Sequence, residues 1–291
     1  MTVTKAVIPA AGLGTRLLPA TKSQPKEMLP VVDKPVLHYV VEEAVNSGVE
    51  DILIIIGRGK RAIVDYFDAY PELENHLLKN GKYDLLEELH KITELANIYY
   101  VRQKNPNGLG DALLYAEKFV GDKPFAVLLG DDITISNPPC TKLLIELYEK
   151  YSENVIAVEE IKKEEVMKYG IIDPEKVENE VYKVKDIVEK PSIDEAPSNL
   201  ATVGRYILTP KIFEYLKRIG PGYGGEIQLT DALRASLKDH GLYALHFKGR
   251  RYDIGDKFGF IRANIELALD REDIGKKIRE YLNNLKHGLK L

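Results

Sequence analysis

Small residues crowd the segment that follows the first apolar run of the chain. They are Ala10, Ala11, Gly12, Gly14 and Thr15. Because bulky side chains are missing there, backbone N–H groups can approach a nucleotide closely and form a concave site for anions. Arg16 adds a cation with a planar fork suited to phosphate oxygens, and Lys26 adds a second positive charge. This combination predicts a site for a nucleoside triphosphate.

The same glycines begin like the dinucleotide-binding motif G-x-G-x-x-G. Leu17 occupies the position of the third glycine, however, and prolines crowd the stretch where that motif requires a helix. These prolines are Pro19, Pro25, Pro30 and Pro35. Such a stretch stays extended and wraps a ligand, so the sequence argues against an NAD site. A purely structural glycine turn is the other alternative, and it leaves Arg16 and Lys26 unexplained.

Two aspartates follow predicted strands, where a doubly wound sheet exposes its ligands. Asp131 comes after the apolar run Phe125–Leu129, and Asp253 lies between a predicted strand and a predicted helix. A carboxylate there can hold Mg²⁺, which takes one or two carboxylates together with phosphate oxygens and water. Asp131 and its neighbour Asp132 could equally cap a helix or form a turn. The residues by themselves leave both interpretations open.

Strand-like and helix-like segments alternate through the first 160 residues. The runs that predict strands are Lys5–Ala10, Asp51–Ile56, Asn97–Val101, Phe125–Leu129 and Asn154–Val158. Helical patterns lie between them, at Pro35–Ser47, Lys60–Tyr70, Leu109–Phe119 and Thr141–Tyr151. This alternation predicts an α/β fold with a doubly wound, largely parallel (mixed) sheet. Ligands bind beyond the carboxyl ends of the strands in such sheets, so the loops after the strands should carry the chemistry.

After residue 160 strand-like and helix-like segments alternate less regularly, although no linker separates the two halves of the chain. Strands are predicted at Val181–Glu189, Ala201–Leu208 and Leu242–Phe247, and helices at Glu226–Asp239, Asp256–Ala268 and Asp273–Leu285. Residues 71–96 look like a helical insertion, because apolar residues recur there at helical spacing. We therefore expect one domain over 1–291, with a nucleotide-binding part (1–160), an elaborated second lobe (161–270) and a closing helix (271–291).

The glycine loop belongs to a longer motif, G-x-G-T-R-x-x-P-x-T followed by P-K-E-M-L-P. This motif resembles the signature of the sugar nucleotidylyltransferases. The run AAGLGTRLLPATKSQPKEMLPVVDKP is similar to their bacterial and archaeal UTP–glucose-1-phosphate uridylyltransferase branch. The resemblance implies a Rossmann-like nucleotide-diphospho-sugar transferase fold with a sugar-binding lobe. It also implies a Mg²⁺-dependent reaction that converts UTP and glucose 1-phosphate into UDP-glucose and pyrophosphate.

Two alternatives stay open beside this reaction. A glucose-1-phosphate thymidylyltransferase would use dTTP, whose base differs from uracil by one methyl group, and a methyl group in a pocket is worth only about 1–3 kcal/mol. A non-catalytic member of the family would bind a sugar nucleotide as a regulatory subunit. Such a member would be expected to lose its cations or metal carboxylates, whereas this chain has all of them: Arg16, Lys26, Asp131, Lys190 and Asp253.

The resemblance assigns roles to the charged residues. Asp131 and Asp253 would hold Mg²⁺. Lys190, a mobile point charge, would hold the phosphate of the hexose 1-phosphate. Arg16 would stabilise the departing pyrophosphate, and Lys26 would stabilise the charge on the α-phosphate of UTP. These three cations are the expected catalytic residues.

Base and sugar contacts also follow from the resemblance. Gln103 and the backbone near Gly108 would recognise uracil, since an amide offers both donors and an acceptor. Many relatives carry His where this chain has Asp111, a departure of little weight because this position is expected to face the helix interior or the rim. In the run GEIQLTDA, Glu226 and Asp231 would cap or orient the following helix. The sugar phosphate would contact Gly170, Glu189, Lys190, Val203 and Gly204.

Bulk composition excludes some classes of partner. A net charge of −4 and a pI near 6.0 argue against a nucleic-acid-binding protein. Cys140 is the only cysteine, which excludes an intramolecular disulfide and favours a cytoplasmic protein. No apolar run approaches the roughly 18–20 residues of a membrane span. His38 is expected to be structural, and a homodimer or homotetramer is expected, with the 71–96 insertion and the C-terminal helices as candidate contacts.

Overall fold

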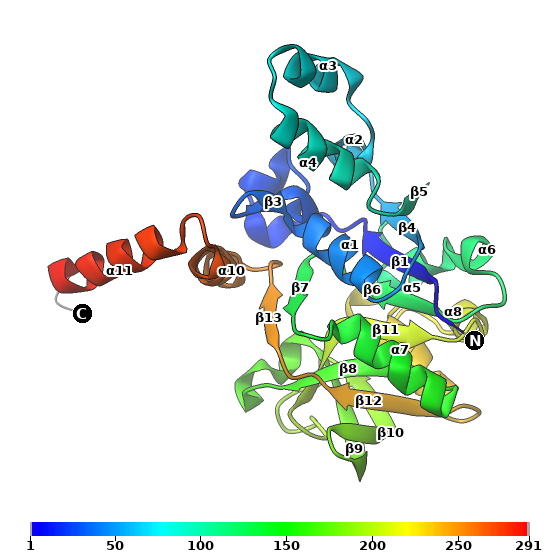
Figure 1. The fold of residues 1–291 in the computed structure, drawn as a ribbon. Coiled ribbons are helices and arrows are strands. Elements are labelled where there is room, and N and C mark those ends of the chain that lie inside the picture. The colour runs from blue at the N-terminus through cyan, green and yellow to red at the C-terminus, as the bar shows by residue number, and fades with distance from the viewer. Residues whose placement is uncertain (1, 290–291) are drawn as a thin grey trace.

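The apolar runs of the sequence form a nine-stranded sheet in the computed structural model, which describes residues 2–289 (Figure 1). The strands of this sheet are β1 (Lys5–Ala10), β4 (Asp51–Ile56), β5 (Asn97–Arg102), β6 (Phe125–Leu128), β8 (Asn154–Glu160), β9 (Gly170–Glu178), β10 (Val181–Glu189), β11 (Leu200–Leu208) and β12 (Leu242–His246). They lie in the order β5-β4-β1-β6-β11-β8-β12-β10-β9. Two small sheets pair β2 (Pro30–Val31) with β3 (Lys34–Pro35), and β7 (Asp132–Ile135) with β13 (Arg250–Asp253).

The large sheet has two halves that differ in strand direction. β5, β4, β1 and β6 run parallel, with Lys5 opposite Asp51 and Ala6 opposite Ala126. Beyond β6 the neighbours are antiparallel, except that β8 and β12 are parallel. Because parallel neighbours end at the same edge, the loops after β1, β4, β5 and β6 come together there. The predicted α/β fold with a doubly wound, mixed sheet is confirmed.

Helices cover both faces of the large sheet. They are α1 (Val36–Asn46), α2 (Arg61–Phe67), α5 (Leu109–Leu114), α7 (Cys140–Tyr151), α8 (Ile212–Arg218) and α9 (Leu229–Ser236). On one face α1, α2 and α7 pack with Ile8 and Ile54, and on the other face α5, α8 and α9 pack with Val7 and Ile55. Since successive side chains of a strand point to opposite faces, β1 and β4 must be apolar at nearly every position.

Several predicted boundaries differ from the structure. The insertion at 71–96 forms two helices, α3 (Pro71–Lys79) and α4 (Tyr83–Thr93). Ile92 of α4 packs against the core, whereas α3 lies farther from the large sheet (Figure 1). The predicted helix Leu109–Phe119 is interrupted between α5 and α6 (Glu117–Val120). Five strands were not predicted: β2, β3, β7, β9 and β13. β2 and β3 have 2 residues each and β7 and β13 have 4, while β9 contains a proline among charged residues.

The C-terminal part ends in two helices, α10 (Lys257–Asp270) and α11 (Gly275–Leu289). Ala263 and Leu267 of α10 pack in a small core with Tyr252 of β13, whereas α11 extends away from the body of the molecule (Figure 1). Residues 1, 290 and 291 of the predicted domain 1–291 lie outside the described residues. Residues 290 and 291 also belong to the predicted closing helix (271–291). No helix within residues 2–289 is long and apolar enough to cross a membrane.

Candidate active site

The loop after β1 forms short 3₁₀ turns where a dinucleotide motif would begin an α-helix. These turns are Thr15–Leu17, Ala20–Lys22 and Lys26–Met28. Gly14 has φ +68°, in the left-handed region that favours glycine, and its carbonyl oxygen accepts a hydrogen bond from Thr21 Oγ1 at 2.7 Å. Ala10 and Ala11 are buried, whereas Gly12, Leu13, Thr15 and Arg16 are exposed. The absence of an α-helix agrees with the prolines, but the prediction that this stretch stays extended is wrong where these 3₁₀ turns form.

Lys26 lies beside the glycines of this loop. A Cβ added to Gly12 would lie 3.7 Å from Lys26 Nζ. The ammonium group pairs with the carboxylate of Asp131. Although burial lowers the pKa of Lys26, the carboxylates of Asp131 and Glu27 together raise it above its usual value. Lys26 therefore keeps its positive charge at neutral pH next to the backbone that was predicted to hold phosphates.

Asp131 and Asp253 come together from distant parts of the chain. Asp131 lies in the turn between β6 and β7, and Asp253 ends β13, the partner strand of β7. The Ile254 N–H donates to the carbonyl oxygen of Asp131 at 2.9 Å. A Cβ added to Gly255 would lie 2.7 Å from Asp253 Oδ1 and 3.2 Å from Asp131 Oδ2. The same point is 3.6 Å from Arg16 Nη1, so two carboxylates and a guanidinium group converge there.

This pair of carboxylates suits a divalent cation. Burial raises the pKa of Asp253 above its usual value, and the nearby charge of Asp131 raises it further. Burial alone would also raise the pKa of Asp131, but Lys26 outweighs this effect and holds it below its usual value. Within residues 2–289 no group of three or more His, Cys, Asp and Glu side chains could enclose a metal ion. Two carboxylates that leave room for phosphate and water fit Mg²⁺, which rarely uses an all-protein cage.

Buried arginines hold the turn that carries Asp131. Arg251 donates to the carboxylate of the next residue, Asp132, at 2.8 and 2.7 Å. The carboxylate of Asp132 therefore forms an ion pair with Arg251. Arg205 is 0% exposed and donates to the Asp132 carbonyl oxygen at 2.6 Å and to Glu43 Oε2 at 2.8 Å. Arg251, Arg205 and Glu43 were not predicted to support the site, since nothing in the sequence shows that these charges meet inside the molecule.

Gln103 lies directly after β5 and is buried. Its backbone N–H donates to the Ile56 carbonyl oxygen at 2.9 Å, which ties Gln103 to the end of β4. Its side-chain Nε2 donates to Asp111 Oδ2 at 2.6 Å and lies 3.4 Å from the Gly108 carbonyl oxygen. The expectation that Asp111 faces the helix interior or the rim is therefore wrong. Asp111 contacts the residue that was predicted to recognise the base.

The segment before α9 closes over the loop that contains Gly108. Gly108 has φ +104°, and a Cβ there would lie 2.7 Å from Glu226 Cβ and 2.7 Å from the Ile227 carbonyl oxygen. The Ile227 N–H donates to the Asn107 carbonyl oxygen at 2.8 Å, and the Gly110 N–H donates to the Ile227 carbonyl oxygen at 2.8 Å. Glu226 therefore packs against the predicted base loop, and Gly108 leaves no space for a larger residue.

The predicted sugar-phosphate residues lie on β9, β10 and β11 and directly after β10. Glu189 ends β10, and its Oε2 accepts a hydrogen bond from Thr230 Oγ1 at 2.7 Å. Lys190 follows with φ +46°, and its Nζ lies 3.3 Å from Glu189 Oε1. The same ammonium group lies 4.9 Å from the centre of the Tyr223 ring. A Cβ added to Gly170 would lie 3.1 Å from Thr230 Oγ1, so Gly170 leaves space beside Glu189.

Val203 and Gly204 lie in β11, next to the turn that carries Asp131. Val203 is 0% exposed, so its side chain belongs to the core and only its backbone could meet a substrate. Gly204 has φ +69°, and its carbonyl oxygen accepts a hydrogen bond from the Leu129 N–H at 3.0 Å. Asp231 lies in the first turn of α9, where burial and the charge of Glu189 raise its pKa.

The loops after β1, β5 and β6 and the ends of β10 and β13 thus carry the residues that were predicted to bind the nucleotide, the metal ion and the sugar phosphate. A family model described as nucleotidyl transferase matches residues 5–269. The chain belongs to the nucleotidyl transferase family. It is 54% identical to the UTP–glucose-1-phosphate uridylyltransferase YngB of Bacillus subtilis (strain 168), over 97% of this chain and 95% of that protein. The family that the motif predicted is confirmed.

Solved structures support the same fold. A UDP-glucose pyrophosphorylase complexed with UDP-glucose is 48% identical with a TM-score of 0.85, covering 92% of this chain and 100% of that chain. The UTP-bound UGPase from Acinetobacter baumannii is 39% identical with a TM-score of 0.90, covering 98% of this chain and 100% of that chain. The Rossmann-like nucleotidyl transferase fold is confirmed.

A second lysine supports the glycine loop of this nucleotidyl transferase. Lys60 Nζ donates to Glu27 Oε2 at 2.7 Å, and both side chains are buried. Burial raises the pKa of Glu27, while Lys60 and Lys26 oppose this effect. Glu27 belongs to the P-K-E-M-L-P motif, which was a signal for it. Lys60 lies just before α2, and nothing in the sequence separated it from an ordinary surface lysine.

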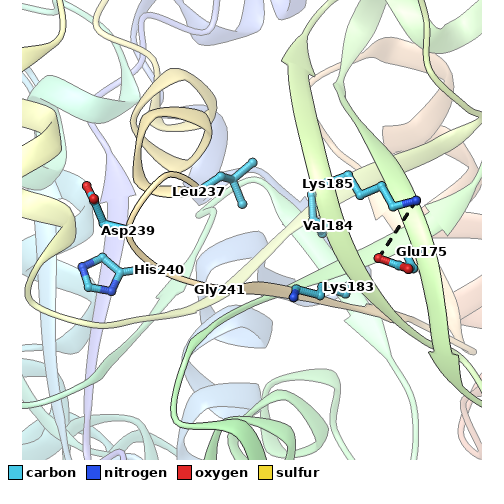
Figure 2. A pocket seen from close by; sticks show the side chains of 8 residues that line it. All are labelled: Glu175, Lys183, Val184, Lys185, Leu237, Asp239, His240 and Gly241. Carbon is cyan, nitrogen blue, oxygen red and sulfur yellow. Dashed lines mark ion pairs between the residues drawn. The ribbon is translucent and has the colours of Figure 1, made fainter.

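A depression of about 460 Å³ lies apart from these residues (Figure 2). It is formed by β9, β10 and the connection between α9 and β12. Glu175 and Lys185 line it, 4.0 Å apart, and Lys183, Asp239 and His240 also line it. None of the predicted site residues belongs to this depression, so the candidate active site is identified by its chemistry and not by this hollow.

Proposed function

We propose that this nucleotidyl transferase joins the uridylyl group of UTP to glucose 1-phosphate and releases pyrophosphate, with Mg²⁺ held by Asp131 and Asp253. The observation that carries the proposal is the convergence of these two carboxylates with Arg16, next to the Lys26–Asp131 ion pair. The names of the related proteins supply the substrate pair, and they support UTP over dTTP.

The proposed reaction needs no nucleophile from the protein. The attacking phosphate oxygen of glucose 1-phosphate is already ionised at neutral pH, so no general base is required. Catalysis of phosphoryl transfer depends mainly on positioning and on the neutralisation of charge. Bound Mg²⁺ would supply part of that positive charge. Lys26 would neutralise charge on the α-phosphate, and Arg16 would stabilise the departing pyrophosphate.

Lys190 and Glu189 would receive the sugar phosphate. Lys190 would hold the phosphate in line for attack, and Glu189 would accept hydrogen bonds from sugar hydroxyl groups. The positive φ of Lys190 supports this role, because such backbone conformations cost about 1–3 kcal/mol in residues other than glycine and cluster at functional sites. Gln103 and the backbone near Gly108 would meet the uracil base.

The metal assignment is tested by Asp131→Asn. We expect this variant to lose Mg²⁺-dependent synthesis of UDP-glucose by at least about a hundredfold, because one of two cation ligands loses its charge. The readout is pyrophosphate release from UTP and glucose 1-phosphate across a Mg²⁺ titration. Circular dichroism and the unfolding midpoint should show that the fold persists.

Asp194→Asn is the matched control, because Asp194 is an exposed aspartate outside the site. It should retain the activity of the unmodified enzyme. Full activity of Asp131→Asn at every Mg²⁺ concentration would contradict the role of Asp131. Activity of the unmodified enzyme without any divalent cation would contradict the metal itself.

The enzyme is also proposed to form a homodimer or homotetramer through its C-terminal helices. Apolar side chains are exposed along α10, at Phe258, Ile261 and Ile265, and along α11, at Tyr281 and Leu285. α10 has 14 residues and α11 has 15. A helix of about that length is only marginally stable in water unless other side chains pack on its apolar side. A second copy of the chain would cover these side chains.

A further inference from the structure

The side-chain amide of Gln103 has one orientation that its neighbours allow. A carboxylate oxygen accepts hydrogen bonds and donates none, so the atom that faces Asp111 Oδ2 at 2.6 Å must be the hydrogen-bearing Nε2. The Gly108 carbonyl oxygen, 3.4 Å from Nε2, is a second acceptor. An exchange of the amide oxygen and nitrogen would set Oε1 against both acceptors. Asp111 and Gly108 therefore determine which end of the amide points away from them.

Oε1 of Gln103 is the end that stays open to a ligand. Within residues 2–289 no group donates a hydrogen bond to it, while Nε2 is engaged. In the described part of the chain, Tyr100 Oη is the sole fully buried side-chain polar atom without a hydrogen-bond partner. Because Gln103 Oε1 also lacks a partner but is not such an atom, it is not fully buried. Oε1 is therefore an accessible hydrogen-bond acceptor beside the base loop.

We propose that Asp111 is a positioning residue that makes Gln103 present a hydrogen-bond acceptor to the base, and so selects bases that carry N3–H. Uracil has a donor at N3, whereas cytosine has an acceptor there. UTP would pair with Oε1, and CTP would set two acceptors against each other. This inference rests on the proposed function, because it takes Gln103 as the residue that meets the base.

The size of the effect follows from the asymmetry of hydrogen bonding. Some sites form hydrogen bonds with a polar group of the substrate. Such a site strongly rejects an analogue that leaves its own polar groups unpaired, and it does so more strongly than a hydrophobic pocket rejects a molecule of similar shape. We expect the unmodified enzyme to favour UTP over CTP in kcat/KM by at least about a hundredfold. Part of this preference should depend on Asp111.

Asp111→Asn tests the inference with a side chain of the same shape. An asparagine can either accept from Nε2 or donate to Oε1, so Gln103 would adopt both orientations. The kcat/KM for CTP should rise and that for UTP should fall a few-fold, so that their ratio falls by about tenfold or more. The affinities for UTP and CTP without sugar phosphate, measured by calorimetry, should shift in the same directions.

The double variant Gln103→Ala/Asp111→Asn separates positioning from a merely structural role. If Asp111 acts through Gln103, Asp111→Asn should no longer change the ratio once Gln103 is an alanine. An unchanged UTP-to-CTP ratio in Asp111→Asn would overturn the inference, as would an equal loss for both nucleotides. If the unmodified enzyme made no UDP-glucose, the proposed function would fail, whereas the calorimetric ratio would still decide the role of Asp111.

Discussion

Lys26 pairs with Asp131, a carboxylate that we propose to hold Mg²⁺. When Asp131 binds a cation, the ammonium group of Lys26 would pair with a phosphate of the nucleotide instead. A charge that is buried without a partner costs several kcal/mol, so this exchange keeps the ammonium group paired with and without substrate. The ion pair thus holds Lys26 close to Gly12 before the nucleotide arrives.

Glu43 is the residue whose loss should cost the most stability around the site. Its carboxylate pairs with Arg205 and accepts hydrogen bonds from Thr134 and Thr141. Glu43→Gln would leave the guanidinium group of Arg205 buried without its counter-charge. Removing one partner of a buried ion pair typically costs about 3–5 kcal/mol, so we expect a loss of about 3 kcal/mol in the free energy of unfolding at pH 7, measured in urea.

The effect of Glu43→Gln should depend on pH. Burial alone would raise the pKa of Glu43, but Arg205 outweighs it and holds the pKa below its usual value. The stability from this carboxylate is therefore present above the pKa of an unfolded glutamate, about 4.3, and is lost as pH falls through the folded value. The difference from the unmodified protein should narrow below about pH 4. Glu146→Gln, at an exposed position of α7, is the control, and a difference that stayed constant with pH would contradict this account.

At the scale of elements, the base loop depends on close contact between two segments. Gly108→Ala would combine a strained positive φ with a Cβ 2.7 Å from Glu226 Cβ. We expect the KM for UTP to rise about tenfold, because a shift of the loop would misplace Gln103, and the unfolding free energy to fall by about 1–3 kcal/mol. Gly48→Ala is a matched control, since Gly48 has φ +92° and nothing within 4 Å of an added Cβ. It should lose stability without any change in the KM for UTP, and an equal rise in KM for both variants would contradict the role of the contact.

The long apolar strands could be predicted from the sequence, and the short ones could not. β1 and β4 are buried on both faces, so nearly every residue in them is apolar and the pattern is strong. β7 and β13 have 4 residues each, and β13 begins with two arginines. A segment that short gains its structure from its partner strand, which the local sequence does not reveal. The same limit explains why the ion pairs of Arg205 and Arg251 were missed.

At the scale of the whole molecule, the sequence indicated the site residues one loop at a time. Topology brings them together, because the parallel strands β1, β4, β5 and β6 end at one edge of the sheet. Asp253 reaches that edge only through the pairing of β13 with β7 (Figure 1). The proximity of Asp131 and Asp253 was therefore expected from family resemblance and could not be derived from spacing. Asp111 shows the opposite case, since its contact with Gln103 contradicted the expectation for that position.

The C-terminal helix offers the last test, which concerns assembly. A chain that ends at Asp273 lacks α11, which packs on α10 and otherwise extends away from the body of the molecule (Figure 1). We expect light scattering to give a mass above the 32.8 kDa of one chain for the full-length protein and the mass of one chain for the truncated protein. The thermal midpoint of the truncated protein should stay within a few degrees of that of the dilute full-length protein, because α11 adds little to the core.

Tyr281→Lys combined with Leu285→Lys should weaken assembly in the same way, whereas Lys276→Ala should not. A full-length protein with the mass of one chain at all concentrations would contradict self-association, and an assembly that survived the truncation would move the contact to another surface, such as α3 and α4.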